Sequence, residues 1–197
     1  MRSALLCGVG GQGTVLASRI IAAAAMNRGW DARTAETIGM AQRGGCVTSH
    51  VRIGENEDEK VPAPLIPTGM ADILIGFEPG EAARNLSYLK EDGILIVCAE
   101  EVTPVTASLG KSGYNGASAI EYLKKNVPNC YVIHGAEICS ACGSPKVLNV
   151  ALLGALAESG AMGLNRDDIL GALAMKLKPK LLPMNEKALD LGAEGVK

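Results

Sequence analysis

The chain has 197 residues, which is enough for one domain and a short appendage. Its 19 basic and 21 acidic side chains give a net charge of -2, without the basic block that a nucleic-acid or anionic-membrane partner would require. The longest apolar run, residues 20–26, is far shorter than the roughly 20 residues of a transmembrane helix, and the apolar N-terminal stretch is too short for a signal peptide, so we expect a cytoplasmic protein.

The first part of the chain is predicted to alternate between strands and a helix. We predict a strand over residues 2–7, a helix over 11–28, and strands over 30–36 and 46–53. Side chains alternate along the last of these strands, with Val47, Ser49, Val51 and Ile53 on one face and Thr48, His50 and Arg52 on the other. We therefore expect His50 to lie on a polar surface or at an interface.

The same alternation continues after a charged, proline-rich loop. We predict strands over residues 72–77, 93–98 and 130–134, and helices over 81–89, 117–126, 146–159 and 166–175. Residues 72–77 and 93–98 are continuous apolar runs, which are typical of parallel strands covered on both faces. The pattern predicts an α/β fold: a three-layer α/β/α Rossmann-like domain with a largely parallel sheet over residues 1–175.

The C-terminal residues 176–197 are more polar than the predicted domain. The KLKPK stretch is predicted to be a linker, followed by a short helix from Met184 to about Leu191. We expect this tail to lie on a partner or on the domain's own surface.

A glycine loop, GVGGQGT from Gly8 to Thr14, joins the first predicted strand to the first helix. Gly8, Gly10 and Gly13 satisfy the G-x-G-x-x-G pattern in the strand-to-helix context that gives it meaning. An anion bound at the helix N-terminus is the favoured interpretation, with Gly10, Gly11, Gln12, Gly13 and Thr14 as candidate binding residues. A tight turn without a ligand is the alternative.

The loop alone does not predict NAD. A dinucleotide site also requires an acidic residue at the end of the second strand to hold the ribose. Asp31 stands at the start of the predicted second strand, and Glu36 leads into the unusual sequence TIGMAQRGG. Neither residue fits the dinucleotide pattern well.

A second candidate site is the stretch AQRGG, in which Arg43 precedes Gly44 and Gly45. An arginine in a predicted loop is exposed and free to reach an anion, while the two glycines indicate backbone packed close to a neighbour. A solvated arginine in a turn is the alternative. Glu78 and His134 end predicted strands at the carboxyl edge of the sheet, where ligands of open sheets bind, and are weaker candidates.

The six cysteines do not predict a metal site. Cys139 and Cys142 form the single C-x-x-C pair, and no second pair or histidine cluster completes a four-ligand zinc or iron-sulfur site. Structural or incidental thiols are the favoured interpretation, with a redox role or a metal shared between subunits as the alternative. Cys7, Cys98 and Cys130 lie in apolar runs and are expected to be small buried side chains.

Four motifs in order resemble the gamma-type subunit of 2-oxoacid:ferredoxin oxidoreductases. They are GVGGQGT, AQRGG followed by VTSHVRIG, ADILIGFEP, and NVALLGALA. The ETIGMAQRGG form, with Met40 and Gln42 before Arg43, is most similar to the beta subunit of the indolepyruvate branch. The resemblance covers residues 1–156 and continues weakly into PMNEKALDLG, whereas the CSAC element is not part of the family's pattern.

The resemblance implies a complex that oxidatively decarboxylates a 2-oxoacid, passes electrons to ferredoxin and transfers the acyl group to coenzyme A. Thiamine diphosphate, Mg²⁺ and [4Fe-4S] clusters would belong to a larger partner subunit, because this sequence lacks the GDG…N signature and a cysteine run. Coenzyme A would be contacted at the glycine loop, with Arg43 as a donor to a phosphate or to the substrate carboxylate. The chain would then be inactive alone and part of a hetero-oligomer.

Two other classes of protein remain open on the sequence. One is a stand-alone NAD-dependent oxidoreductase, although no catalytic acid, base or nucleophile accompanies the loop. The other is a noncatalytic module that binds an adenine nucleotide. Co-purification with a large partner, or its absence, would separate these classes.

Overall fold

The computed structural model describes residues 1–39, 44–102 and 114–197. Its strands are β1 (Arg2–Val9), β2 (Ala32–Ile38), β3 (Cys46–Ile53), β4 (Ala71–Gly76), β5 (Leu89–Cys98) and β6 (Cys130–Ile133). Its helices are α1 (Thr14–Asn27), α2 (Pro79–Arg84), α4 (Gly116–Asn126), α5 (Gly135–Cys142), α6 (Leu148–Ser159), α7 (Arg166–Lys176) and α8 (Leu182–Glu194). Within these ranges, no helix has both the length and the apolar character needed to cross a bilayer.

The strands form one sheet in the order β2-β3-β1-β4-β5-β6. β1, β4, β5 and β6 pair in parallel, whereas β3 is antiparallel to both of its neighbours, β1 and β2. The predicted α/β fold with a largely parallel sheet is therefore confirmed. β3 lies between β1 and β2, so these two strands do not pair. In the usual dinucleotide-binding fold the first two strands are neighbours, so the strand order of this sheet is different.

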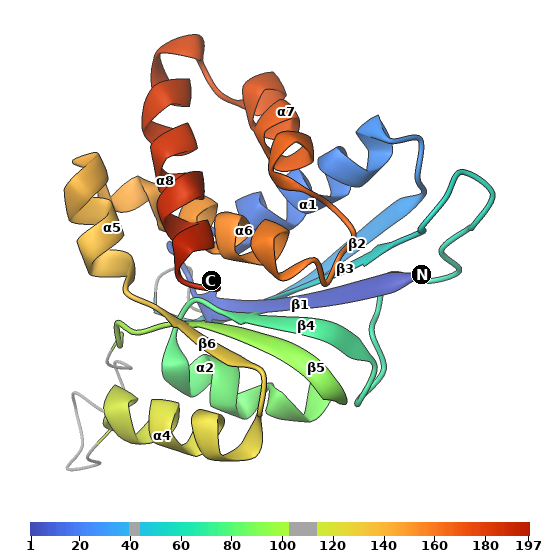
Figure 1. The fold of residues 1–197 in the computed structure, drawn as a ribbon. Helices are drawn as coiled ribbons and strands as arrows, with labels where there is room; N and C mark the ends of the chain where they lie inside the picture. Colours follow the sequence, from blue (N-terminus) through green and yellow to red (C-terminus); the bar gives the residue numbers. More distant parts are fainter. Residues whose placement is uncertain (40–43, 103–113) are drawn as a thin grey trace.

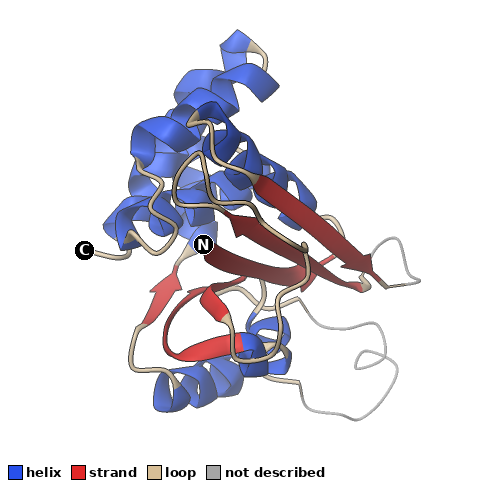
Figure 2. Cartoon of the chain, turned by 90° about the vertical axis from the view of Figure 1, so that its right-hand side faces the viewer, coloured by secondary structure: helices blue, strands red, loops and turns tan. Residues whose placement is uncertain are grey.

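Helices cover the sheet in two layers (Figure 1). α1, α5, α6, α7 and α8 lie on one face, and α2 and α4 lie on the other. The same division is visible in the perpendicular view of Figure 2, in which the sheet lies between the helix layers. The two faces bury separate apolar clusters, built around Leu6 and Leu153 on one side and around Leu5 and Leu74 on the other.

Three of the helices that follow α1 differ from the sequence prediction. The helix predicted over residues 81–89 is the short α2, followed by a 3-10 turn at Leu86–Tyr88 and the early start of β5. α5 was not predicted, and it places both cysteines of the CSAC element on one helix. The last helix, predicted over residues 184–191, is longer and packs against α6.

His50 is buried within the chain, whereas its polar strand face predicted a polar surface or an interface. Only 6% of the residue is accessible, and its Nδ1 accepts a hydrogen bond from the Ile66 N–H at 3.2 Å. Its ring packs edge-on against Tyr88. The proline-rich loop after β3 folds back over this face of the sheet, so burial lowers the pKa of His50 from 6.5.

α6 and α8 cross at very short range because each has a glycine at the contact. A Cβ on Gly154 would lie 1.9 Å from the Leu189 carbonyl oxygen, and one on Gly192 would lie 1.8 Å from that of Ala151. The C-terminal helix is therefore seated directly on the backbone of α6.

Candidate functional site

The glycine loop lies at the carboxyl end of β1, between β1 and α1. Gly11 has φ 106° and Gly13 has φ 91°, a region of backbone conformation that residues with a Cβ rarely adopt. These angles cannot continue into a right-handed helix, so α1 begins at Thr14 and not at Gly11 as predicted.

The side chain of Gln12 holds the loop against the sheet. Its Oε1 accepts from the Val9 N–H at 2.7 Å, and its Nε2 donates to the Phe77 carbonyl at 2.9 Å. A Cβ on Gly8 would lie 2.7 Å from both Gln12 Oε1 and Phe77 Cβ, so glycine is required there. The side-chain amide of Gln12 is therefore already hydrogen-bonded at both ends within the protein.

The first turn of α1 presents free backbone donors. The first hydrogen bond of the helix joins the Ala17 N–H to the Gly13 carbonyl at 3.0 Å. The N–H groups of Thr14, Val15 and Leu16 have no partner among the residues that the structure describes, and the first turn carries no acidic side chain. Free N–H groups and the positive end of the helix dipole make this turn suited to an anion.

The structure brings together the two segments that the sequence singled out. The Gly10 N–H donates to the Gly45 carbonyl at 2.8 Å, and Gly44 has φ 77°. The cause is the antiparallel pairing of β3 with β1, which places Cys46 opposite Val9 at the same edge of the sheet. Arg43 itself lies outside the described residues.

A pocket of about 510 Å³ opens beside the loop. It is lined by Gly11, Gln12, Gly13, Leu16, Pro145, Lys146, Leu148 and Asn149. Among the described residues of this lining, Lys146 is the one charged side chain; it is exposed, while Asn149 is only 4% accessible. Neither residue was predicted as a site residue, although Asn149 is a polar residue that opens the otherwise apolar stretch NVALLGALA.

The acidic residues considered for a ribose lie elsewhere in the fold. Glu36 accepts a long hydrogen bond of 3.4 Å from Ser18 Oγ of α1, and Asp31 accepts from the Val61 N–H at 2.9 Å. Both belong to the β2 side of the sheet, which β3 separates from β1. The geometry thus gives no support to a dinucleotide site of the usual kind.

Glu78 is buried and caps α2. Its carboxylate accepts from the Glu81 N–H at 2.9 Å and from the Tyr114 hydroxyl. Burial, together with this carboxylate, raises the pKa of Tyr114. Glu78 is therefore satisfied within the protein and holds the start of α4 against α2.

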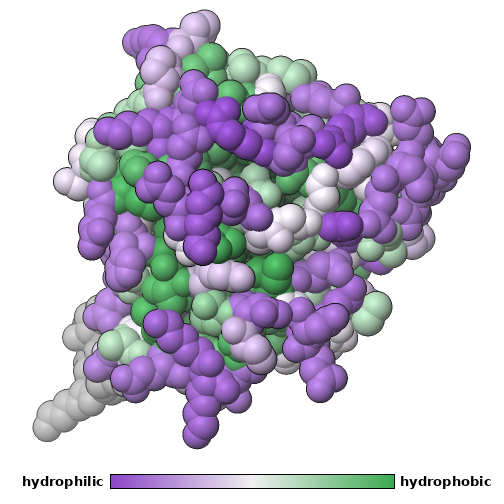
Figure 3. Space-filling model, viewed as in Figure 1, coloured by the Kyte–Doolittle hydropathy of each residue, from purple (hydrophilic) through white to green (hydrophobic). Residues whose placement is uncertain are grey.

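His134 lies on the rim of a different pocket, of about 410 Å³, between β6, α5 and α8. Apolar side chains such as Ile133, Ile138 and Leu191 line it. Figure 3 shows this side of the molecule as mostly hydrophilic, with apolar atoms visible in the hollow between the upper helices and the sheet. His134 is exposed and is not among the residues that line the pocket beside the glycine loop.

The cysteines do not fit an iron-sulfur cluster. Cys139 and Cys142 share α5, the Cys139 thiol donates to the Pro145 carbonyl at 3.8 Å, and burial raises its pKa. Throughout residues 1–39, 44–102 and 114–197, no three His, Cys, Asp or Glu side chains are grouped to hold a metal ion. A cluster requires four thiolate ligands, which this arrangement does not offer.

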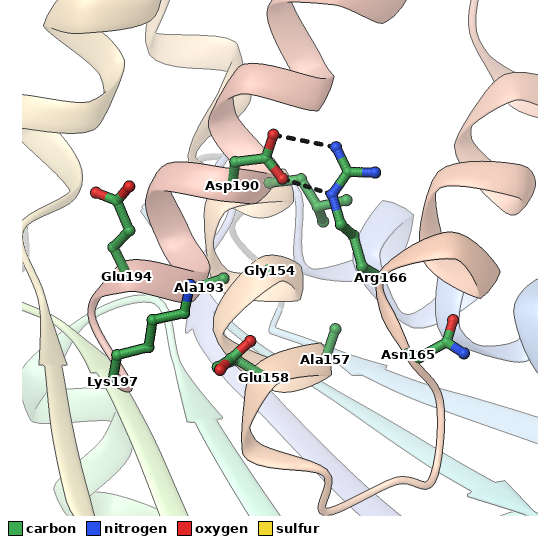
Figure 4. Close-up of a pocket in the computed structure, with 10 residues that line it drawn as sticks. Gly154, Ala157, Glu158, Asn165, Arg166, Asp190, Ala193, Glu194 and Lys197 are labelled. Atoms are coloured by element: carbon green, nitrogen blue, oxygen red, sulfur yellow. Dashed lines mark hydrogen bonds and ion pairs between the residues drawn. The ribbon is translucent and has the colours of Figure 1, made fainter.

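A third pocket, of about 430 Å³, lies between α6, α7 and α8 (Figure 4). Arg166 reaches over it and is paired with Asp190 at 2.6 Å and with Glu186 at 2.9 Å. Glu158, Glu194 and Lys197 also line it, so its described lining has three carboxylates against two cations and its arginine is neutralised. It does not suit a phosphate group.

Known proteins match this chain over most of its length. A family model described as pyruvate ferredoxin/flavodoxin oxidoreductase matches residues 3–195. Indolepyruvate oxidoreductase subunit IorB of Archaeoglobus fulgidus is 38% identical over 189 residues, covering 95% of this chain and 92% of the relative.

Two solved structures share the fold. The gamma subunit of a keto/oxoacid ferredoxin oxidoreductase from Geobacter sulfurreducens has a TM-score of 0.72 at 22% identity, covering 100% of this chain and 98% of its own. The 2-oxoglutarate:ferredoxin oxidoreductase from Magnetococcus marinus has a TM-score of 0.67 at 18% identity, covering 99% of this chain and 31% of its own. The match over nearly the whole length shows that the chain belongs to the pyruvate ferredoxin/flavodoxin oxidoreductase family, as a gamma-type subunit of a 2-oxoacid:ferredoxin oxidoreductase.

Proposed function

We propose that this chain is the small subunit of an indolepyruvate, or arylpyruvate, ferredoxin oxidoreductase. In this assembly the 2-oxoacid is oxidatively decarboxylated, its acyl group is transferred to coenzyme A, and ferredoxin receives the electrons. The proposal of an aryl substrate is supported by the name of the Archaeoglobus fulgidus relative and by the ETIGMAQRGG element of this sequence.

The cofactors of the reaction are proposed to lie on a larger partner subunit. The described donors of this chain do not fit a cluster, and its acidic residues do not gather as ligands for the Mg²⁺ that accompanies thiamine diphosphate. No step of the electron transfer is therefore assigned to residues of this chain.

The role proposed for this chain is to bind the phosphates of coenzyme A at the glycine loop. The single observation that carries it is the free first turn of α1, which follows two glycines in positive-φ conformations. Phosphate-rich ligands suit such a turn because donors and helix dipole act together. The Magnetococcus marinus structure was solved with coenzyme A and succinyl-CoA bound, which shows that a longer enzyme containing this fold takes these ligands.

Arg43, Gly44 and Gly45 are proposed to form the other wall of the same site. The hydrogen bond from the Gly10 N–H to the Gly45 carbonyl supports this proposal, because Gly45 lies beside the loop. A guanidinium there would donate to a phosphate of coenzyme A or to the carboxylate of the 2-oxoacid.

The proposal is tested by expressing the tagged chain in its native host and identifying what co-purifies. We expect a large subunit, and arylpyruvate- and coenzyme A-dependent reduction of a viologen dye by the complex. The chain purified alone should be colourless and inactive. Activity of the isolated chain, or micromolar binding of NAD by it, would instead support the stand-alone oxidoreductase.

A further inference from the structure

The start of α6 and the 3-10 turn before it contribute two polar residues, Lys146 and Asn149, to the pocket beside the glycine loop. The 3-10 turn at Pro145–Val147 and the first residues of α6 line the loop pocket opposite Gly11 and Gly13. The glycine loop and the start of α6 therefore line the same pocket. The Lys146 ammonium adds positive charge to this lining, and none of its described residues is acidic.

The orientation of the Asn149 amide is fixed by its own helix. Its Oδ1 accepts from the Val150 N–H at 3.0 Å, so Oδ1 is held on α6 and Nδ2 is the end of the amide that lies near Gly13. Nδ2 lies 3.1 Å from the position that a Cβ would occupy on Gly13. Gly13 thus admits the amide to the start of α1, in addition to supplying the positive φ.

The Asn149 Nδ2 group has no acceptor among the described residues. Asn149 is 4% accessible as a whole residue and lines the pocket, so its amide is the part of the side chain that a ligand in the pocket can reach. The Thr14 hydroxyl, in the first turn of α1, is buried with no partner in the described part of the chain. A buried polar group without a partner costs about 1 to 3 kcal/mol, so such groups are expected where a ligand supplies the missing bond.

We propose that Asn149 and Lys146 complete the phosphate site of the glycine loop. The Asn149 Nδ2 donates a hydrogen bond to a phosphate oxygen held by the first turn of α1, and Lys146 supplies the cation at the pocket mouth. This inference rests on the proposed function, because it assigns these residues to the same coenzyme A phosphates. It adds α6 to a site that the sequence placed on the glycine loop and on Arg43.

The test is the calorimetric affinity of the full chain and of the assembled complex for coenzyme A, with pantetheine as the ligand lacking phosphates. Asn149→Asp replaces the donor with an acceptor of the same shape, and we expect it to weaken coenzyme A binding at least about tenfold. Lys146→Ala should weaken it about threefold and reduce its salt dependence. Pantetheine should bind equally weakly to the parent and to both variants.

Lys180→Ala is the matched control, because Lys180 is exposed on the 3-10 turn at Pro179–Leu181 and does not line the pocket. Thermal melting checks that each variant is folded, and Lys146→Ala on the surface keeps the test valid if Asn149→Asp is unstable. If folded Lys146→Ala and Asn149→Asp both bind coenzyme A like the parent, the inference is overturned and the proposed function stands. If the parent complex shows no phosphate-dependent binding, the coenzyme A role of the loop fails as well.

Discussion

Gly11 has two roles in the glycine loop: it adopts a positive φ, and its lack of a side chain leaves the pocket open. Its φ is positive, and a Cβ there would have no atom within 4 Å, so the pocket mouth stays open at this position. Gly143, at the end of α5, has φ 73° and is equally free of neighbours, but it does not line the loop pocket. The two glycines differ mainly in their distance from the proposed ligand.

Gly11→Val and Gly143→Val should therefore have similar effects on stability and different effects on binding. Each variant should lose about 1 to 2 kcal/mol of unfolding free energy, because a β-branched residue is strained at positive φ. Only Gly11→Val should raise the KM for coenzyme A in the complex, by about tenfold or more. Equal KM values in the two variants would remove the loop from the binding site.

His50 makes stability depend on pH. Burial lowers its pKa from 6.5, so the unfolded chain takes up a proton before the folded chain does as the pH falls. The contribution of His50 to the free energy of unfolding should be constant above a pH of about 6.5, the pKa of an unfolded histidine. It should decrease as the pH falls below that value. Thermal melting at pH 7 and at lower pH measures the loss.

His50→Asn is the informative variant, because an amide oxygen can replace Nδ1 as the acceptor for the Ile66 N–H. It should reduce the loss of stability between pH 7 and pH 5.5. The exposed His134 offers the comparison, and His134→Asn should keep the parent's pH dependence. The idea is wrong if both variants behave like the parent.

At the scale of elements, the contact between α6 and α8 depends on glycine. Gly154→Ala would place a methyl group 1.9 Å from the Leu189 carbonyl oxygen, so α8 must move away from α6. We expect a loss of at least about 2 to 3 kcal/mol in urea unfolding, typical of severe overpacking.

Gly171→Ala in α7 is the matched control for this helix contact. A Cβ there has no neighbour within 4 Å and the residue is exposed, so alanine should stabilise the chain by about 0.5 to 1 kcal/mol. A Gly154→Ala variant as stable as the parent would show that α8 is seated loosely.

The elements that the sequence missed are those whose structure depends on distant partners. α5 is short, opens with Gly135 and packs against α8. The local sequence does not show this contact with a distant helix, so it did not predict α5. His50 occupies a polar strand face that a loop from residues beyond the strand covers. The role of Asn149 could not be predicted, because the hydrophobic pattern predicts an apolar helix but not which of its side chains contacts the glycine loop.

At the scale of the whole molecule, the alternation of strands and helices predicted the α/β layers correctly. The apolar runs of β4 and β5 identified the buried centre of the sheet, and the strand-turn-helix context identified the glycine loop. The strand order could not be predicted, because hydrophobic pattern specifies which face of a strand is buried and not which strand lies beside it. The proximity of Gly10 to Gly45 follows from that order.

The position of β3 also sets the order in which the sheet can form. β2 and β3 are consecutive antiparallel strands, whereas the β1–β3 register joins residues as distant as Arg2 and Ile53. Short-range antiparallel ribbons close in microseconds, while pairing over long sequence separations must first overcome the entropy of the intervening chain. We therefore expect pulsed hydrogen exchange to show protection of β2–β3 before β1, with the glycine loop acquiring its shape only after β1 docks. Simultaneous protection of all three strands would contradict this order.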